Sequence, residues 1–329
     1  MEYRRIIEAF ATTPFALQPE KLREIAAFFE LKAAGGVLSE AEIASRIAGR
    51  RQTEAPLVLH QAAGGSSSTG RSAGSVAVIQ IFGVVTQRAG MMSEVSGGSS
   101  TERVSARIRQ AIADRDVSRI ILEIDSPGGG VYGVAELADE IHRARSQKPI
   151  IAMASSLAAS AAFWIASACS EVVVTPSGEV GSIGVYGIHE DWSKADEKRG
   201  VKFTLVKAGK FKAEGVDFAP LTDAAAGHMQ ARVNDYYSMF VRAVAKGRGV
   251  SEKEVRDGFG EGRVVGAAEA VRLKMADRVG TLGDTLARLG VKGGALASAV
   301  AFDKSPAAAF DADHDRRANR NALRQRVAK

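Results

Sequence analysis

Short apolar runs rich in β-branched residues alternate with helical patterns through the middle of the chain. Five such runs predict strands, namely SVAVIQIFGVV (75–85), RIILEID (119–125), PIIAMAS (149–155), EVVVT (171–175) and VKFTLVKAG (201–209). Helices are predicted by the apolar spacing at 101–115, 133–146, 223–247 and 266–280. Strands that alternate with helices and are apolar throughout predict an α/β domain over residues 76–292, with mostly parallel, buried strands and flanking helices.

The two ends of the chain have a different pattern. Residues 1–60 contain helical spacing at 19–34 and a capping box, Ser39-x-x-Glu42, that opens a second helix, so this region predicts a small helical appendage. Residues 61–75 are rich in glycine and serine and predict a flexible linker. Residues 293–329 are first Ala-rich and then basic, and we expect a flexible tail.

Composition is that of an ordinary soluble globular protein. Of 329 residues, 46% are hydrophobic and 25% charged, and no run approaches the roughly 20 apolar residues that a membrane helix needs. The first residues lack an apolar stretch followed by a cleavage site, so we expect no signal peptide and a cytoplasmic protein. The lone cysteine, Cys169, excludes an intramolecular disulfide and predicts a small core residue. No His or carboxylate spacing suggests a metal site, and no cofactor is expected.

The net charge of +6 is unevenly distributed. Residues 1–60 are neutral, whereas the last fourteen residues, RRANRNALRQRVAK, hold six bases and no acid. A nucleic-acid-binding surface would need bases along the folded body, so specific nucleic-acid binding is not expected. The basic end is either a solvated terminus or a segment that recruits an acidic partner protein.

Two small-residue segments suggest chemistry at the ends of predicted strands. Gly128, Gly129 and Gly130 follow a strand and precede a helix, where glycines let a backbone approach a ligand and present N–H groups. The pattern is neither a phosphate loop nor G-x-G-x-x-G. Ser160 lies among alanines at a predicted helix start, where unpaired N–H donors stabilise a tetrahedral oxyanion. Each segment alone is equally compatible with a structural turn or an N-cap.

The order of the motifs narrows the interpretation. D-S-P-G-G-G, S-S-L-A-A-S-A-A, E-V-G-S-I-G-V-Y and K-A-G-K-F-K follow one another between residues 125 and 212. Together they resemble the signal-peptide peptidase A (SppA) family of serine peptidases, whose fold belongs to the ClpP/crotonase superfamily. The resemblance covers about residues 75–285. One departure is visible, because related peptidases often have A-A-S-G-G-Y-Y where this chain has A-A-S-A-A-F-W.

The resemblance implies a Ser/Lys dyad. By analogy with the family, Ser160 is the nucleophile, Lys212 is the general base, and the N–H groups of Gly129 and Ala161 form the oxyanion hole. Gly128, Gly130 and Ser182 are expected to contact substrate. A lysine accepts a proton only when neutral, so the base requires apolar surroundings, which Phe211 is expected to supply.

Other bases remain open. Lys207 and Lys210 are weaker candidates in the same segment, and a Ser-His-Asp triad would use His189 or His228. Two functions outside the peptidases also remain open. The chain could be a catalytically silent scaffold or interaction protein, or a crotonase-type acyl-CoA enzyme.

Within the family, a branch encoded by tailed bacteriophages processes scaffold, portal or capsid proteins in the immature head. Its members have a pattern like F-A-L-x-P-E-K-L, found here at residues 15–22. The resemblance therefore predicts a phage prohead protease that forms a homo-oligomer, acts on protein substrates and lacks a membrane anchor. The alternative is a soluble bacterial SppA-like housekeeping peptidase.

Overall fold

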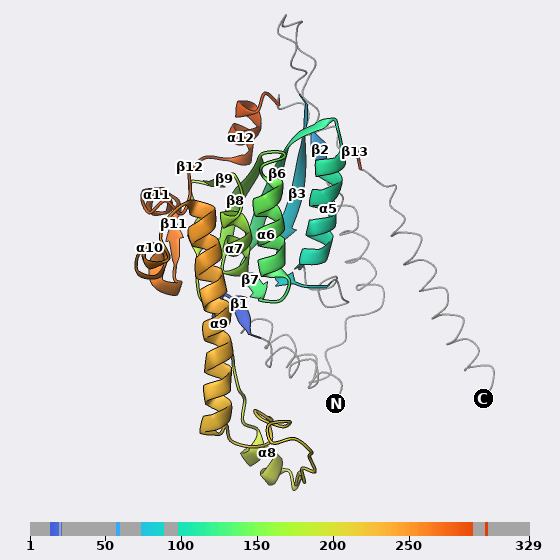
Figure 1. Cartoon of the computed structure of the whole chain (residues 1–329), viewed down its shortest axis with the longest axis vertical. Coiled ribbons are helices and arrows are strands. Elements are labelled where there is room, and N and C mark those ends of the chain that lie inside the picture. Colours follow the sequence, from blue (N-terminus) through green and yellow to red (C-terminus); the bar gives the residue numbers. More distant parts are fainter. Residues whose placement is uncertain are drawn as a thin grey trace, which may run out of the picture.

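A mostly parallel sheet forms the centre of the molecule (Figure 1). The computed structural model describes residues 14–19, 21, 57–59, 74–88, 98–291 and 300–301. The strands of the large sheet follow the order β11-β10-β8-β6-β3-β2-β13, with β9 beside β8 and β12 beside β9. Their bounds are β2 Leu57–Leu59, β3 Ser75–Phe82, β6 Val117–Ser126, β8 Ile150–Ala159, β9 Glu171–Val174, β10 Glu179–Gly181, β11 Val264–Gly266, β12 Arg278–Val279 and β13 Val300–Ala301.

The centre of this sheet is parallel and its outer strands are antiparallel. Strands β3, β6, β8 and β9 run parallel to one another, as do β10 beside β8 and β12 beside β9. Strands β2, β11 and β13 pair antiparallel. The central strands contain buried apolar runs, such as Ile120, Ile121 and Leu122 in β6, because both faces of the sheet are covered there, which removes the alternation of a half-exposed sheet.

A second, smaller sheet lies at the carboxyl ends of the central strands. Its order is β1-β7-β4-β5, with bounds β1 Phe15–Leu17, β7 Gly128–Gly130, β4 Val85–Thr86 and β5 Ser99–Ser100. Strand β7 follows β6 after one residue, so the small sheet continues directly from the middle of the large one.

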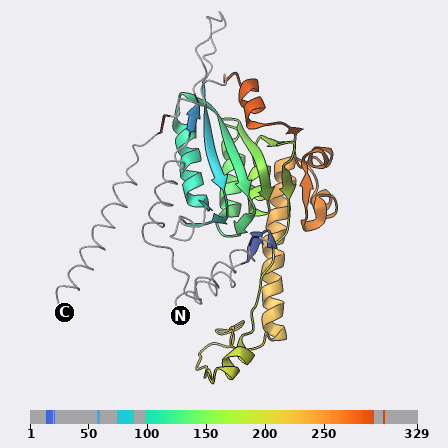
Figure 2. The ribbon, with the colours of Figure 1, turned by 180° about the vertical axis from the view of Figure 1, so that it is seen from behind.

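Helices lie over one face of the large sheet (Figure 1). They are α5 Thr101–Ala113, α6 Val134–Ala144, α7 Ala161–Ser167 and the carboxyl-terminal half of α9 Asp223–Arg248. The main core lies between these helices and the sheet and includes Ile108, Ile141 and Trp164. On the other face, seen in Figure 2, α12 Leu282–Arg288 packs Leu286 in a second cluster with Val78 and Met153.

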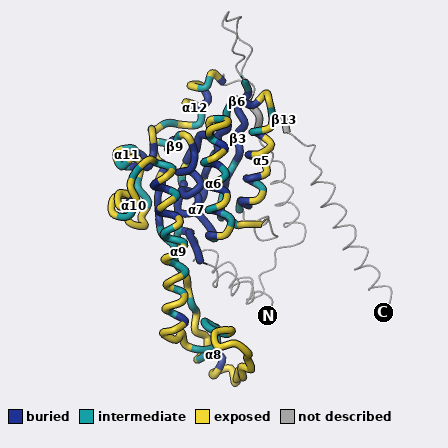
Figure 3. Tube along the Cα trace, viewed as in Figure 1, coloured by how far each residue is buried: buried dark blue, intermediate teal, exposed yellow. Residues whose placement is uncertain are grey.

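The amino-terminal half of α9 projects away from this body (Figure 3). The short helix α8 Ser193–Lys198 and the segment that joins it to α9 lie at the end of the projection (Figures 1 and 3). We call residues 187–235 the extension. The remaining helices, α10 Glu252–Gly258, η1 Gly260–Gly262 and α11 Ala267–Arg272, flank β11.

A glycine of helix α9 lies close against the end of α7. A Cβ atom added to Gly247 would lie 2.1 Å from the carbonyl oxygen of Ser167, whereas a Cβ on Gly227 in the same helix would meet nothing within 4 Å. We expect Gly247→Ala to lower the free energy of unfolding by about 1–3 kcal/mol through overpacking. Gly227→Ala is the matched control and should raise it by about 0.5–1 kcal/mol, because alanine favours a helix. Urea denaturation of both variants tests the pair, and an equal effect at the two positions would contradict this packing.

Most of the predicted elements are confirmed. Strands are found in the four predicted segments between residues 75 and 175, and helices at the three predicted positions that became α5, α6 and α9. The helix predicted for 266–280 is shorter, because Lys274 has a φ of 63° after α11 and Arg278–Val279 pairs with β9 as a strand.

The strand predicted for residues 201–209 is wrong. This segment has no regular secondary structure, and all nine residues are exposed. Its β-branched and aromatic residues suit a sheet, but no described strand of this chain pairs with it. The pattern alone does not show where a partner strand would come from.

The predictions for the two ends fall largely outside the described residues. Of the helices predicted in residues 1–60, only Pro19 and Lys21 are described. Nearly all of the linker predicted at 61–75 lies outside the described residues. The same is true of the tail after residue 291, apart from Val300 and Ala301. What the structure does describe within residues 1–60 are the strands β1 and β2, and both pair with strands of the main body.

Candidate active site

Ser160 occupies a sharp turn between β8 and α7. Its φ of 57° and ψ of −120° are unusual for a residue with a side chain, a conformation that costs about 1–3 kcal/mol and clusters at functional sites. The N–H of Ser160 donates to the carbonyl of Gly181 over 2.7 Å, and its own carbonyl accepts from the N–H of Trp164 over 2.9 Å. The alanines on either side, such as Ala159 and Ala161, are fully buried, so their small size lets the turn pack tightly.

The glycine strand β7 lies directly beside this turn. A Cβ on Gly128, whose φ is 97°, would come within 2.9 Å of the Cβ of Ser160. A Cβ on Gly129 would lie 1.8 Å from the carbonyl oxygen of Val85 in β4. Only glycine therefore lets this backbone pass between β4 and Ser160, which is the close approach that the sequence motif predicts.

Ser126 holds the start of the glycine strand, a role that the sequence analysis missed. Its side chain is fully buried; the hydroxyl donates to the carbonyl of Gly83 over 2.6 Å and accepts from the N–H of Gly128 over 3.2 Å. A serine before the Pro-Gly-Gly-Gly run was the available signal, because such hydroxyls commonly bond to nearby backbone groups.

Ser182 reaches the same edge of the sheet through β10. This strand pairs with β8 so that Gly181 lies opposite Ala159, and Ser182 follows with a φ of 53°. Its N–H donates to the carbonyl of Arg263 over 2.7 Å. The structure thus brings Gly128, Ser160 and Ser182 together, although each comes from a different strand end.

The predicted base does not lie at this edge. Lys212 is exposed, and it belongs to the segment between α8 and α9, which Figure 1 shows at the far end of the extension. Lys207 and Lys210 are in the same segment, where the amine of Lys207 donates to the carbonyl of Lys210 over 3.2 Å. One copy of the chain therefore holds the serine and these lysines apart.

The other candidate residues do not replace this lysine. The His189 ring bonds to the carbonyl of Val216 over 3.1 Å, and His228 is exposed in the projecting half of α9. Neither ring is hydrogen-bonded to Ser160 in the described structure. Cys169 is buried, and desolvation raises the pKa of its thiol to about 12, which confirms a core residue and leaves it a poor nucleophile.

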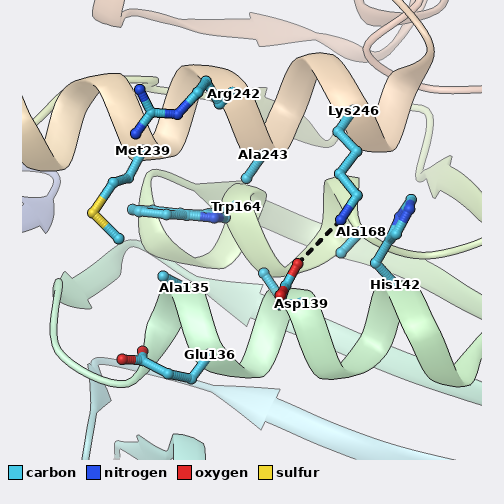
Figure 4. Close-up of a pocket in the computed structure, with 11 residues that line it drawn as sticks. Ala135, Glu136, Asp139, His142, Trp164, Ala168, Met239, Arg242, Ala243 and Lys246 are labelled. Carbon is cyan, nitrogen blue, oxygen red and sulfur yellow. Dashed lines mark hydrogen bonds and ion pairs between the residues drawn. The ribbon is translucent and has the colours of Figure 1, made fainter.

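A pocket of about 390 Å³ opens on the outer side of α7, between α6 and α9 (Figure 4). Trp164 lies across it, stacked on Phe240 with ring centroids 4.7 Å apart, and the Lys246–Asp139 ion pair spans one side at 3.2 Å. Ser160 does not line this pocket. Ser160, at the amino-terminal end of α7, therefore lies outside this pocket.

Within the described residues, no group of three or more His, Cys, Asp or Glu side chains could hold a metal ion. None of the helices in that part of the chain is long and apolar enough to span a membrane.

A family model and several known proteins match this chain. Residues 142–295 match the model of Peptidase family S49. The head-tail preconnector protein GP5 of Enterobacteria phage P21 is 37% identical over 181 residues, which is 55% of this chain and 36% of that protein. The capsid assembly protease C of Escherichia phage lambda is 34% identical over 204 residues, 62% of this chain and 46% of that protein. A putative signal peptide peptidase SppA of Enterococcus faecium is 29% identical over 181 residues, 55% of this chain and 52% of that protein.

The chain spans less than half the length of the two phage relatives. The matches confirm the predicted resemblance to SppA-like peptidases, including the phage group, and the mostly parallel sheet with its flanking helices is consistent with the ClpP/crotonase-like fold. Residues 142–295 of the chain therefore match peptidase family S49, and the chain as a whole is similar to SppA-like and phage proteases.

Proposed function

We propose that this chain is a serine endopeptidase in which Ser160 attacks the peptide carbonyl. The observation that carries the proposal is the junction of Ser160 with the glycine strand, where a nucleophile in a sharp turn lies against backbone N–H donors. Such donors stabilise the negative charge that develops on the carbonyl oxygen in the transition state.

The proposed reaction uses these groups in two steps. The Ser160 hydroxyl loses its proton to the base and bonds to the carbonyl carbon, while the N–H groups of Gly129 and Ala161 receive the oxyanion. The base then returns the proton to the leaving amine as the C–N bond breaks. Water hydrolyses the acyl-enzyme by the same steps and regenerates Ser160.

Lys212 serves as the base from a second copy of the chain. Two features support this. Within one chain Lys212 is exposed in the extension, away from Ser160, so a dyad of these two residues needs a second copy. The same segment also exposes large apolar side chains, which an isolated soluble chain rarely leaves in water. These side chains are Val201, Phe203, Leu205, Val206 and Phe211.

Mixing two inactive variants tests the shared site. Ser160→Ala and Lys212→Ala are each expected to be inactive alone, and a mixture is expected to regain part of the activity, because some interfaces then combine an intact serine with an intact lysine. A fluorogenic peptide and light scattering on the same samples measure hydrolysis and assembly.

The matched control is Lys210→Ala, two residues from the proposed base, which should stay close to wild type. A wild-type monomer with full activity, or a mixture as inactive as its parts, would contradict a dyad shared between copies.

The natural substrates that we propose are proteins of an immature phage head, such as scaffold, portal or capsid proteins. The support is the similarity to two phage proteins, one of which is named a capsid assembly protease. Mass spectrometry of such head proteins, incubated with wild type and with Ser160→Ala, tests the assignment. Cleavage that depends on Ser160 supports it, whereas hydrolysis of short peptides with every head protein left intact would favour a housekeeping peptidase.

A further inference from the structure

A segment of the chain itself occupies the edge of the glycine strand. Strand β1 pairs antiparallel with β7, so that Phe15 lies opposite Gly130, Ala16 opposite Gly129 and Leu17 opposite Gly128. On its other side, Phe15 exchanges two backbone hydrogen bonds with Tyr186, of 2.9 and 3.0 Å. The segment is therefore held as a strand between two parts of the body.

The register determines which atom faces the proposed oxyanion hole. The N–H of Gln18 donates to the carbonyl of Pro127 over 3.0 Å, and the N–H of Val131 donates to the carbonyl of Pro14 over 3.3 Å. Hydrogen-bonded pairs recur at every second position of an antiparallel ladder, so the pair midway between these two is also hydrogen-bonded. That pair is Ala16 and Gly129, which directs the N–H of Gly129 to the carbonyl oxygen of Ala16.

This carbonyl also lies beside the nucleophile. A Cβ on Gly128 would be 2.2 Å from the carbonyl oxygen of Ala16 and 2.9 Å from the Cβ of Ser160. Both groups thus crowd the same side of Gly128. The carbonyl of Ala16 has a serine and an oxyanion donor as neighbours, as the carbonyl of a bound substrate would.

We propose that residues 14–18 are an intramolecular pseudosubstrate that a peptide must displace to reach Ser160. This inference rests on the proposed function and extends it to the substrate class. The substrate would bind as an extended strand antiparallel to β7, with a small residue at the position of Ala16. The size limit follows from burial, because Ala16 is 0% exposed within the main core.

Freeing the strand should activate the full-length protein. Ala16→Arg places a long charged side chain where alanine is fully buried, so β1 should leave its position. If the segment fills the site about 90% of the time, its release raises the apparent kcat/KM for a fluorogenic peptide about tenfold. Gln18→Ala is the matched control, because Gln18 is held here through its backbone N–H and should leave the rate unchanged.

A second measurement does not depend on the folding of a variant. The synthetic peptide PFALQP, which copies residues 14–19, should inhibit wild type competitively, and the same peptide with arginine in place of alanine should not. The intact mass of wild type should remain that of the uncut chain.

The outcomes separate this inference from the proposed function. If a fluorophosphonate labels Ser160 and peptides are hydrolysed, but folded Ala16→Arg is no faster and PFALQP does not inhibit, the pseudosubstrate is refuted. Cleavage between Ala16 and Leu17 would also overturn the inhibitory role. If neither wild type nor Ala16→Arg reacts with the probe or cleaves any peptide, the proposed function itself fails.

Discussion

Ser160→Ala is expected to lower kcat on a peptide substrate by a factor on the order of 10⁴ or more, because no other group can form the acyl-enzyme. Labelling by a fluorophosphonate should disappear with it. The fold should survive, since alanine retains the Cβ that the turn already accommodates and Ser160 donates and accepts there through its backbone. Steady-state kinetics and intact-protein mass spectrometry measure the two effects.

A serine on the same strand provides the control for this variant. Ser156 is exposed on β8, four residues before the turn, and Ser156→Ala should leave both turnover and labelling near wild type. Residual labelling of Ser160→Ala at the wild-type rate would assign the nucleophile elsewhere.

Gly129→Ala is expected to have the second largest effect. The new methyl group would lie 1.8 Å from the Val85 carbonyl oxygen, so β4 or β7 must move and the Gly129 N–H must lose its position. Loss of one oxyanion donor typically lowers kcat by about 10²–10³. The overpacking should also lower the free energy of unfolding by about 1–3 kcal/mol. Peptide hydrolysis and thermal unfolding on one sample separate the two losses.

Gly184→Ala is the matched control, because its Cβ would meet only the Cα of Gly262 at 3.9 Å. Gly184→Ala should therefore leave both kcat and the free energy of unfolding close to those of wild type. A Gly129→Ala protein with wild-type turnover would show that this N–H takes no part in the reaction.

The predictable parts of the fold are the elements whose burial produces a regular pattern of apolar residues in the sequence. Strands β3, β6 and β8 are covered on both faces over much of their length, so each contains an apolar run without strict alternation. Helices such as α5 and α6 are buried on one face only, so their apolar residues recur at helical spacing.

The elements that the sequence analysis missed have no such apolar pattern. Strand β7 consists of three glycines, which have low β propensity, and it is a strand only because β1 and β4 pair with it. Strand β1 is three residues long, too short for a periodic pattern, and its partner lies more than a hundred positions along the chain. Residues 201–209 are the opposite case. Their composition is typical of a strand, but no described strand pairs with them.

The site was predictable to the same extent. The proposed nucleophile and its glycine neighbours come from motifs at strand ends. Parallel strands bring their carboxyl ends to one edge, so Gly128, Ser160 and Ser182 lie near one another as expected. The position of Lys212 was not predictable from the sequence. Lys212 lies just before α9, and the direction in which α9 projects depends on how its carboxyl-terminal half packs against the body.

The exposed apolar side chains of the extension have a consequence for timing. If neither copy alone holds a complete dyad, the number of working sites follows mass action, and hydrolysis at low concentration rises with the square of the amount of protein. Dilution would then abolish hydrolysis without unfolding the protein. Copies confined with their substrates inside a small shell would become active once their local concentration exceeded the dissociation constant of the pair, so that confinement itself would start proteolysis.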